Sequence, residues 1–144
     1  PQAFRLLLPL LFDGMGHDKW PVKVCALNGL KALAEGHARE EVAAELYDAV
    51  PKITEAMWDS KDEVMAAAKS AMEACTATAD NRDLAPFAPT IIECVLKPDL
   101  VPECIHKLAA TVFVQEIKSP ALAVTVPLLF RGLKERATDI RRKA

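Results

Sequence analysis

Apolar and polar positions along the chain recur as pairs of helical stretches. Val50, Ile53 and Met57 fall at the spacing of one face of an α-helix. From residue 64 a second stretch repeats that spacing, with apolar side chains at Val64, Ala67, Ala68, Ala71, Met72 and Cys75. The residues between the two stretches are mostly polar, so they predict a short turn. The pattern therefore predicts two helices, each with one apolar face that must be buried against a neighbour.

This pair of stretches recurs along the chain. Prolines mark the same place in each unit, at intervals of 42, 38 and 38 residues: Pro9, Pro51, Pro89 and Pro127. Apolar residues stand two positions after each proline, at Leu11, Ile53, Ile91 and Leu129. Because proline has no N–H to donate, each is expected to bend the first helix of its unit. The third unit breaks step after Lys97, and its second helix is expected to place Ile105 and Ala109 on the apolar face.

The second helix of the first unit is expected to start at Pro21, which suits a first helical turn. Its predicted apolar side carries Val22, Cys25, Ala26, Leu30 and Leu33. In the second unit, Ser60 followed by Glu63 predicts a capping box at the start of the second helix. Ser119 is likewise expected to cap the helix that begins beside Pro120.

A two-helix unit cannot bury both of its faces, whereas stacked units share a continuous core. The sequence therefore predicts an all-α fold, a right-handed α-solenoid of antiparallel helix pairs. The expected repeats are 1–36, 37–79, 80–118 and a partial repeat at 119–144. The chain begins at Pro1 and stops in a helix-like run, so we expect an array truncated at both ends, with adjacent repeats as its immediate partners.

Composition and charge narrow the classes of function. Half of the 144 residues are apolar and the net charge is −2, which excludes a disordered chain and a wholly basic nucleic-acid binder. The longest apolar run is too short to span a membrane. Residues 34–63 nevertheless carry nine acidic and three basic residues, and residues 127–144 carry two and six. The carboxylates Glu40, Glu41, Glu45 and Asp48 are interpreted as a solvated acidic face rather than as an acid–base pair.

The basic end is the candidate contact surface. Its residues are Arg131, Lys134, Arg136, Arg141, Arg142 and Lys143, and they are expected to neutralise RNA phosphates. An ordinary solvated face, or a contact with an acidic neighbouring repeat, remains open as an alternative. Lys19, Lys23 and Lys61 stand at or after turns and form a secondary candidate edge. Trp20 and Trp58 occupy the same turns and are interpreted as hydrophobic plugs.

The chain has no constellation typical of catalysis. It contains no G-x-x-x-x-G-K-[ST] phosphate loop, G-x-S-x-G elbow or H-E-x-x-H helix. Cys94, Cys104 and His106 lack the fourth ligand and the tight spacing of a structural zinc site. The cysteines, Cys25, Cys75, Cys94 and Cys104, are expected to be buried reduced thiols. We therefore expect no catalytic, metal or cofactor-binding residue and no small-molecule substrate.

The repeat resembles HEAT repeats. Asp59 stands in the turn, as in that family's pattern. Lys23 and Arg141 directly follow the valine or isoleucine of the second helix, where the family pattern has a basic residue. Longer strings resemble the HEAT domain of the elongation factor 3 family: Glu55-Ala56-Met57-Trp58-Asp59-Ser60-Lys61-Asp62-Glu63-Val64, Thr78-Ala79-Asp80-Asn81-Arg82-Asp83, Val101-Pro102-Glu103, Val126-Pro127-Leu128-Leu129-Phe130-Arg131-Gly132-Leu133-Lys134-Glu135-Arg136 and Asp139-Ile140-Arg141-Arg142-Lys143. The similarity covers the chain from about residue 6 and is strongest after residue 50.

The resemblance implies a segment of a cytoplasmic, ribosome-binding ATPase of the ABC type, found in fungi. In that family the HEAT domain docks on ribosomal RNA and proteins, and separate domains use ATP and Mg²⁺ to assist elongation and release of exit-site tRNA. This chain would then be a docking scaffold with no membrane contact and no chemistry of its own. Three alternatives stay open: the similar HEAT region of the activator of the initiation-factor-2 kinase, a tubulin-binding array, and a generic HEAT scaffold.

Overall fold

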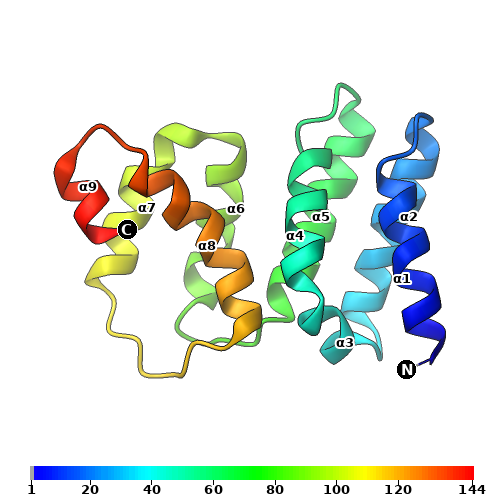
Figure 1. Ribbon diagram of the computed structural model, residues 1–144, viewed down its shortest axis with the longest axis horizontal. Coiled ribbons are helices and arrows are strands. Elements are labelled where there is room, and N and C mark those ends of the chain that lie inside the picture. Colours follow the sequence, from blue (N-terminus) through cyan, green and yellow to red (C-terminus); the bar gives the residue numbers. More distant parts are fainter. Residues whose placement is uncertain (1) are drawn as a thin grey trace.

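The computed structural model describes residues 2–144, which form antiparallel helices stacked in two layers (Figure 1). In chain order, the α-helices are α1 (Gln2–Met15), α2 (Trp20–Glu35), α3 (Arg39–Ala44), α4 (Leu46–Ala56), α5 (Asp62–Ala77), α6 (Ala88–Leu96), α7 (Val101–Ala110), α8 (Ser119–Leu133) and α9 (Thr138–Lys143). Short 3₁₀ turns, Ala85–Phe87 and Pro98–Leu100, precede α6 and α7. The described chain is all-helical, as the hydrophobic periodicity predicts. The expected first repeat starts at Pro1, which lies outside the described residues.

The first two helix pairs stack regularly. Helix α1 packs on α2 and α4 on α5, and the two pairs join through α1–α4 and α2–α5 contacts. Helix α5 buries the face predicted from the sequence, from Val64 to Cys75, together with Thr76. Alanines on this face have little side chain to separate the helices, so α2 and α5 lie close together. The apolar core of this half therefore lies between the two layers of helices.

The third pair departs from this stacking. Helix α6 packs against α5, and α8 lies in front of α6 and directly against α4 (Figure 1). Units two and four therefore touch, although unit three lies between them in sequence. The connection that allows this is the extended segment 111–118, which carries the chain from the end of α7 back to the start of α8. Of the two residues predicted for the apolar face of α7, Ile105 is buried but Ala109 is exposed.

The 111–118 segment is held by the polar turn before α6. The Asp83 carboxylate accepts hydrogen bonds from the backbone N–H groups of Val114 and Gln115, both at 2.7 Å. The Arg82 N–H donates to the side-chain carbonyl of Gln115 at 2.8 Å. Asn81 caps its own turn, because its Oδ1 accepts from the N–H groups of Asp83 and Leu84. The two bonds to Asp83 satisfy backbone donors that the extended segment cannot pair internally, and the other bonds satisfy donors of the turn itself.

Several local predictions were wrong. Helix α5 begins at Asp62 and α8 at Ser119, and neither start has a side-chain cap, so Ser60 and Ser119 are not helix caps. Pro89 lies in the first turn of α6, unlike Pro9, Pro51 and Pro127, which lie inside their helices.

The buried face of α2 agrees with the predicted one only in part, at Ala26 and Leu30. It buries Ala26, Leu27, Leu30 and Ala34. Of the other predicted residues, Leu33 is partly buried against the core, whereas Val22 and Cys25 are exposed.

Candidate RNA-contact surface

The turns that join the two helices of each pair lie along one edge of the stack. They span residues 16–19, 57–61, 97–100 and 134–137, at the top of Figure 1. Each turn carries an exposed lysine: Lys19, Lys61, Lys97 and Lys134. We call this line of turns the turn edge. Lys97 was not among the predicted contact residues, although its position in the third turn follows the same repeat.

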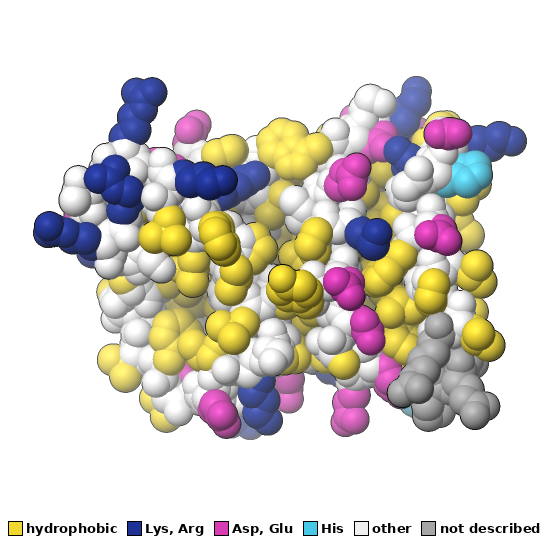
Figure 2. All heavy atoms as spheres, viewed as in Figure 1, with side chains coloured by type: hydrophobic (Ala, Val, Ile, Leu, Met, Phe, Trp, Pro, Cys, Tyr) yellow, Lys and Arg dark blue, Asp and Glu magenta, His cyan; other side chains and the backbone are white. Residues whose placement is uncertain are grey.

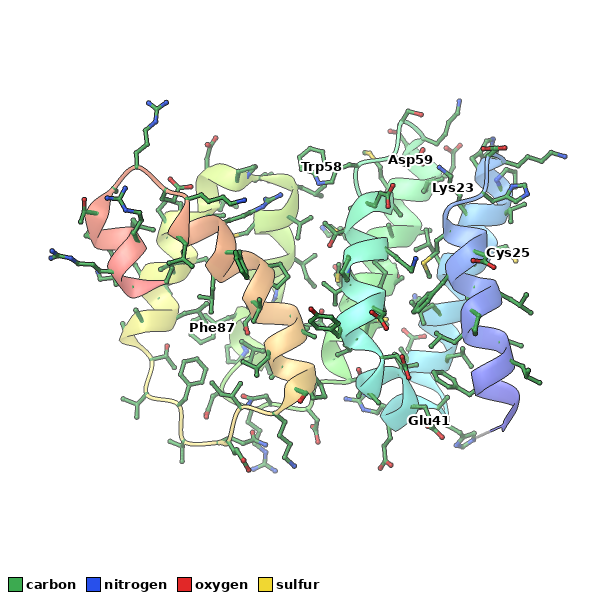
Figure 3. The ribbon with its side chains drawn as sticks, viewed as in Figure 1. Lys23, Cys25, Glu41, Trp58, Asp59 and Phe87 are labelled. Carbon is green, nitrogen blue, oxygen red and sulfur yellow. The ribbon has the colours of Figure 1, made fainter. Side chains whose placement is uncertain are left out.

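Asp59 builds the second turn. Its Oδ1 accepts a hydrogen bond from the Lys61 N–H at 3.0 Å, and its Oδ2 lies 2.6 Å from the Lys23 ammonium of α2 (Figure 3). The hydrogen bond from Lys23, followed by that from the Lys61 backbone, lowers the pKa of Asp59. This pair links the second helix of one unit to the turn of the next. Lys23 therefore has a structural partner, whereas Lys19 and Lys61 project into solvent.

Both tryptophans are exposed: Trp58 lies in the second turn, and Trp20 is the first residue of α2, directly after the first turn. Trp20 is 41% exposed and Trp58 is 54% exposed, so the predicted plugs are wrong. In Figure 3 Trp58 points away from Asp59, which turns toward Lys23. An exposed indole beside lysines offers a flat surface on which an unpaired nucleobase can stack. The turn edge thus combines positive charge with aromatic area.

The six basic residues predicted at the chain's end divide into two groups. The Arg131 guanidinium donates to the carbonyls of Cys94 and Val95 at 2.8 and 3.3 Å, which satisfies the C-terminal end of α6. Arg141 donates to the carbonyls of Glu135 and Arg136, at 3.0 and 2.9 Å, and to the Thr138 hydroxyl. Both arginines therefore hold the protein together, in addition to any role at the surface.

The second group is more available to a partner. The side chains of Lys134, Arg136 and Arg142 are exposed and make no hydrogen bond or ion pair with any residue that the structure describes. Lys143 is exposed too, with its ammonium 2.5 Å from Nδ1 of His106. Figure 2 shows dark blue side chains gathered at the corner of the stack formed by α8 and α9, and magenta ones over α4. The charge split seen in the sequence is thus also a split in space.

The cysteines form no disulfide, and one of them is accessible. Cys75, Cys94 and Cys104 are buried, but Cys25 is exposed, contrary to the prediction. Burial raises the pKa of the Cys75 thiol to about 12. A hydrogen bond to Cys104, together with burial, raises the pKa of Cys94.

Within residues 2–144, no three His, Cys, Asp or Glu side chains converge on a possible metal position. No described helix is long and apolar enough to cross a membrane.

Comparisons with known proteins agree with the resemblance seen in the sequence. Residues 1–72 match the family described as EF3 N-terminal HEAT repeat, and residues 99–144 match the one described as Elongation factor 3/GNC1 HEAT repeat. The chain is 42% identical to elongation factor 3A of Saccharomyces cerevisiae and 41% identical to elongation factor 3 of Candida albicans, over its whole length. It is 41% identical to elongation factor 3 of Phytophthora infestans over 96% of the chain. It spans only 13–14% of each relative.

Proposed function

Because the chain belongs to the elongation factor 3 family and forms part of its HEAT-repeat region, we propose that it docks a translation factor on the ribosome. The contact runs along the turn edge and the α8–α9 corner. The observation that carries the proposal is the exposed positive charge there, from Lys19, Lys61, Lys97, Lys134, Arg136 and Arg142. Ribosomal RNA presents phosphates at high density, and binding these side chains releases counterions.

The proposed parent protein is an ABC-type ATPase of the cytoplasm. Its nucleotide-binding domains, with ATP and Mg²⁺, lie outside this chain and assist elongation and release of exit-site tRNA. This segment supplies position rather than chemistry: it fixes where the ATPase sits on the ribosome. The similarity of the chain to elongation factor 3 over its whole length supports this assignment.

One observation favours a second function. The family matched by residues 99–144 carries two names in its description, elongation factor 3 and GNC1. The same fold would then serve a regulatory scaffold, the activator of the initiation-factor-2 kinase. Sequencing the gene downstream separates the two. Two phosphate loops of the ABC type support the first function, and a long run of further HEAT repeats supports the second.

Charge reversal tests the docking surface. In the full-length protein, Lys134→Glu, Arg136→Glu and Arg142→Glu are combined and ribosome co-sedimentation is measured between 50 and 200 mM salt. If each side chain contacts one phosphate, the log–log salt slope becomes shallower by roughly 2 to 3, since each contact contributes about 0.7 to 0.9. Arg131 and Arg141 are left intact because they hold structural carbonyls.

The matched control reverses three exposed charges away from the turn edge. Arg82→Glu, Lys69→Glu and Lys118→Glu change the net charge by the same amount on α5 and on the opposite edge. The control is expected to bind with the original salt slope. Equal binding by both triple variants would remove the assignment of the RNA contact to this surface.

A further inference from the structure

A second surface, on the other layer of the stack, has a different chemistry. Helices α4 and α8 enclose a groove of about 940 Å³. It exists because α6 packs behind them, so that α8 lies beside α4 and crosses the face at an angle to it (Figure 1). Its lining comes from α4 and α8: Tyr47, Asp48, Pro51, Lys52, Glu55, Ser119, Leu122, Ala123, Val126, Pro127 and Phe130.

The α8 wall of the groove is apolar. Leu122 is 44% exposed and Phe130 is 60% exposed, and Tyr47 on the facing wall is 79% exposed. Figure 2 shows yellow side chains over the middle of this face. Each of these three side chains is therefore open to solvent over a large part of its surface. A contiguous apolar patch with a polar margin marks an interaction site more often than a solvated surface.

The α4 wall of the groove is acidic. Asp48 and Glu55 line it, almost two turns apart. Lys52 lies between them, but its ammonium is 5.5 Å from the centre of the Phe12 ring in α1, which packs on the side of α4 away from α8. On α8, the Arg131 guanidinium turns back to the α6 carbonyls. The groove therefore has an apolar side and a side with two carboxylates and one ammonium, so the charged residues of its lining sum to −1.

We propose that this groove binds an amphipathic helix of a partner protein, with its apolar stripe against α8 and lysines or arginines along the edge that faces α4. Helix α8 has 15 residues and is about 22 Å long, so it matches a partner helix of three to four turns. A groove between two helices accepts the side-chain ridge of a third helix. Asp48 and Glu55 repel phosphates, which argues against RNA as the occupant. The groove shares no residue with the turn edge, so binding of this helix is independent of the proposed ribosome docking.

The test uses the full-length protein and three fluorescein-labelled 14-residue peptides. The first carries leucines at helical spacing with flanking lysines, the second has glutamates in place of the lysines, and the third is a scramble of the first. Fluorescence anisotropy is expected to show the lysine peptide binding at least tenfold more tightly than the other two. Asp48→Lys combined with Glu55→Lys is expected to reverse the preference between the first two peptides.

A matched pair of variants tests the apolar wall. Phe130→Ser is expected to weaken binding of the lysine peptide at least tenfold. Leu133→Ser, on the same helix but outside the groove lining, is expected to leave it unchanged. Circular dichroism confirms that each variant keeps its helix content, and loss of helix in Phe130→Ser leaves the charge reversal as the deciding measurement.

Three outcomes overturn the proposal. The first is equal binding, or no binding, of the three peptides. The second is displacement of the lysine peptide by single-stranded oligouridylate at low micromolar concentration, which identifies RNA as the occupant. The third is concentration-dependent dimerisation of the protein that Phe130→Ser abolishes, which assigns the groove to a second copy of the chain.

Discussion

Replacing Gly132 by alanine perturbs the closest helix contact in the second half of the fold. Gly132 is buried near the end of α8, where α7 and α9 both pack against it. A Cβ at this position would lie 2.0 Å from Cδ1 of Ile105 and 2.8 Å from Cβ of Ala144. Both distances are far below van der Waals contact, so the Ile105 side chain must change its conformation, or the helices must move apart, to admit one methyl group.

The expected cost is the difference between two opposing effects. Overpacking of a well-packed site destabilises by about 1–3 kcal/mol. Alanine is favoured over glycine inside a helix by about 0.5–1 kcal/mol, which offsets part of that cost. From the middle of both ranges, Gly132→Ala is therefore expected to lower the free energy of unfolding by about 1 kcal/mol, and by no more than about 2.5 kcal/mol. Gly16→Ala is the control, because a Cβ there meets only the Asp13 carbonyl at 3.7 Å.

Urea unfolding followed by far-UV circular dichroism measures the effect, and Ile105→Val identifies its origin. This second change removes the Cδ1 atom that the new methyl group meets, and alone it is expected to cost about 0.5–1.5 kcal/mol. If the contact is responsible, the double variant loses about 1 kcal/mol less than the sum of the single losses. Strict additivity, or a Gly132→Ala variant as stable as the original protein, would refute the reasoning.

Three further predictions concern the turns and the thiols. Asp59→Asn keeps the acceptor for the Lys61 N–H but removes the charge that pairs with Lys23. Because the pKa of Asp59 is lowered in the folded state, its stabilisation is present at neutral pH and is lost as the pH falls through that lowered value. The urea midpoints of the variant and the original should therefore differ at pH 7 and converge in acid; a gap that persists in acid contradicts this. Asp83→Ala removes the acceptor of two backbone N–H groups and is expected to cost about 1.5–3 kcal/mol, with faster hydrogen exchange at Val114 and Gln115; unchanged exchange there would be the contrary result. At pH 7.5 a maleimide is expected to label Cys25 first, and Cys25→Ala should remove the fast phase in mass spectrometry; rapid labelling of Cys75 would contradict its burial.

The regular half of the fold could be predicted from sequence, and the reason is local. On α5 the apolar spacing and the alanines leave one way to bury the helix, and the predicted face is the observed one. On α2 the pattern was ambiguous, because Val22 and Cys25 are apolar and share the predicted face but are exposed. Periodicity gives the faces of a helix, whereas the neighbours decide which of them is covered.

The arrangement of the third unit was beyond the sequence pattern. The break in step after Lys97 was predicted, but neither the contact of α8 with α4 nor the bonds that hold segment 111–118 to Asp83 were. The surface shows the same limit. A count of charges treats Arg131 and Lys134 alike, although the Arg131 guanidinium is bonded to α6 carbonyls and the Lys134 ammonium has no partner among the described residues. Whether the free residues bind RNA stays a prediction.

The contact between α4 and α8 alters the mechanics of the stack. In a regular solenoid each unit touches only the next, so the array extends like a spring and can unravel from an end one unit at a time. Here α8 packs directly against α4, although unit three lies between them in sequence, and Asp83 binds the segment 111–118 that leads into α8. Pulling the two ends apart must break the α4–α8 contact before the units separate. The stretch from α4 to α8 should therefore yield as a single block in a force-extension measurement, a stiff arm rather than an elastic one.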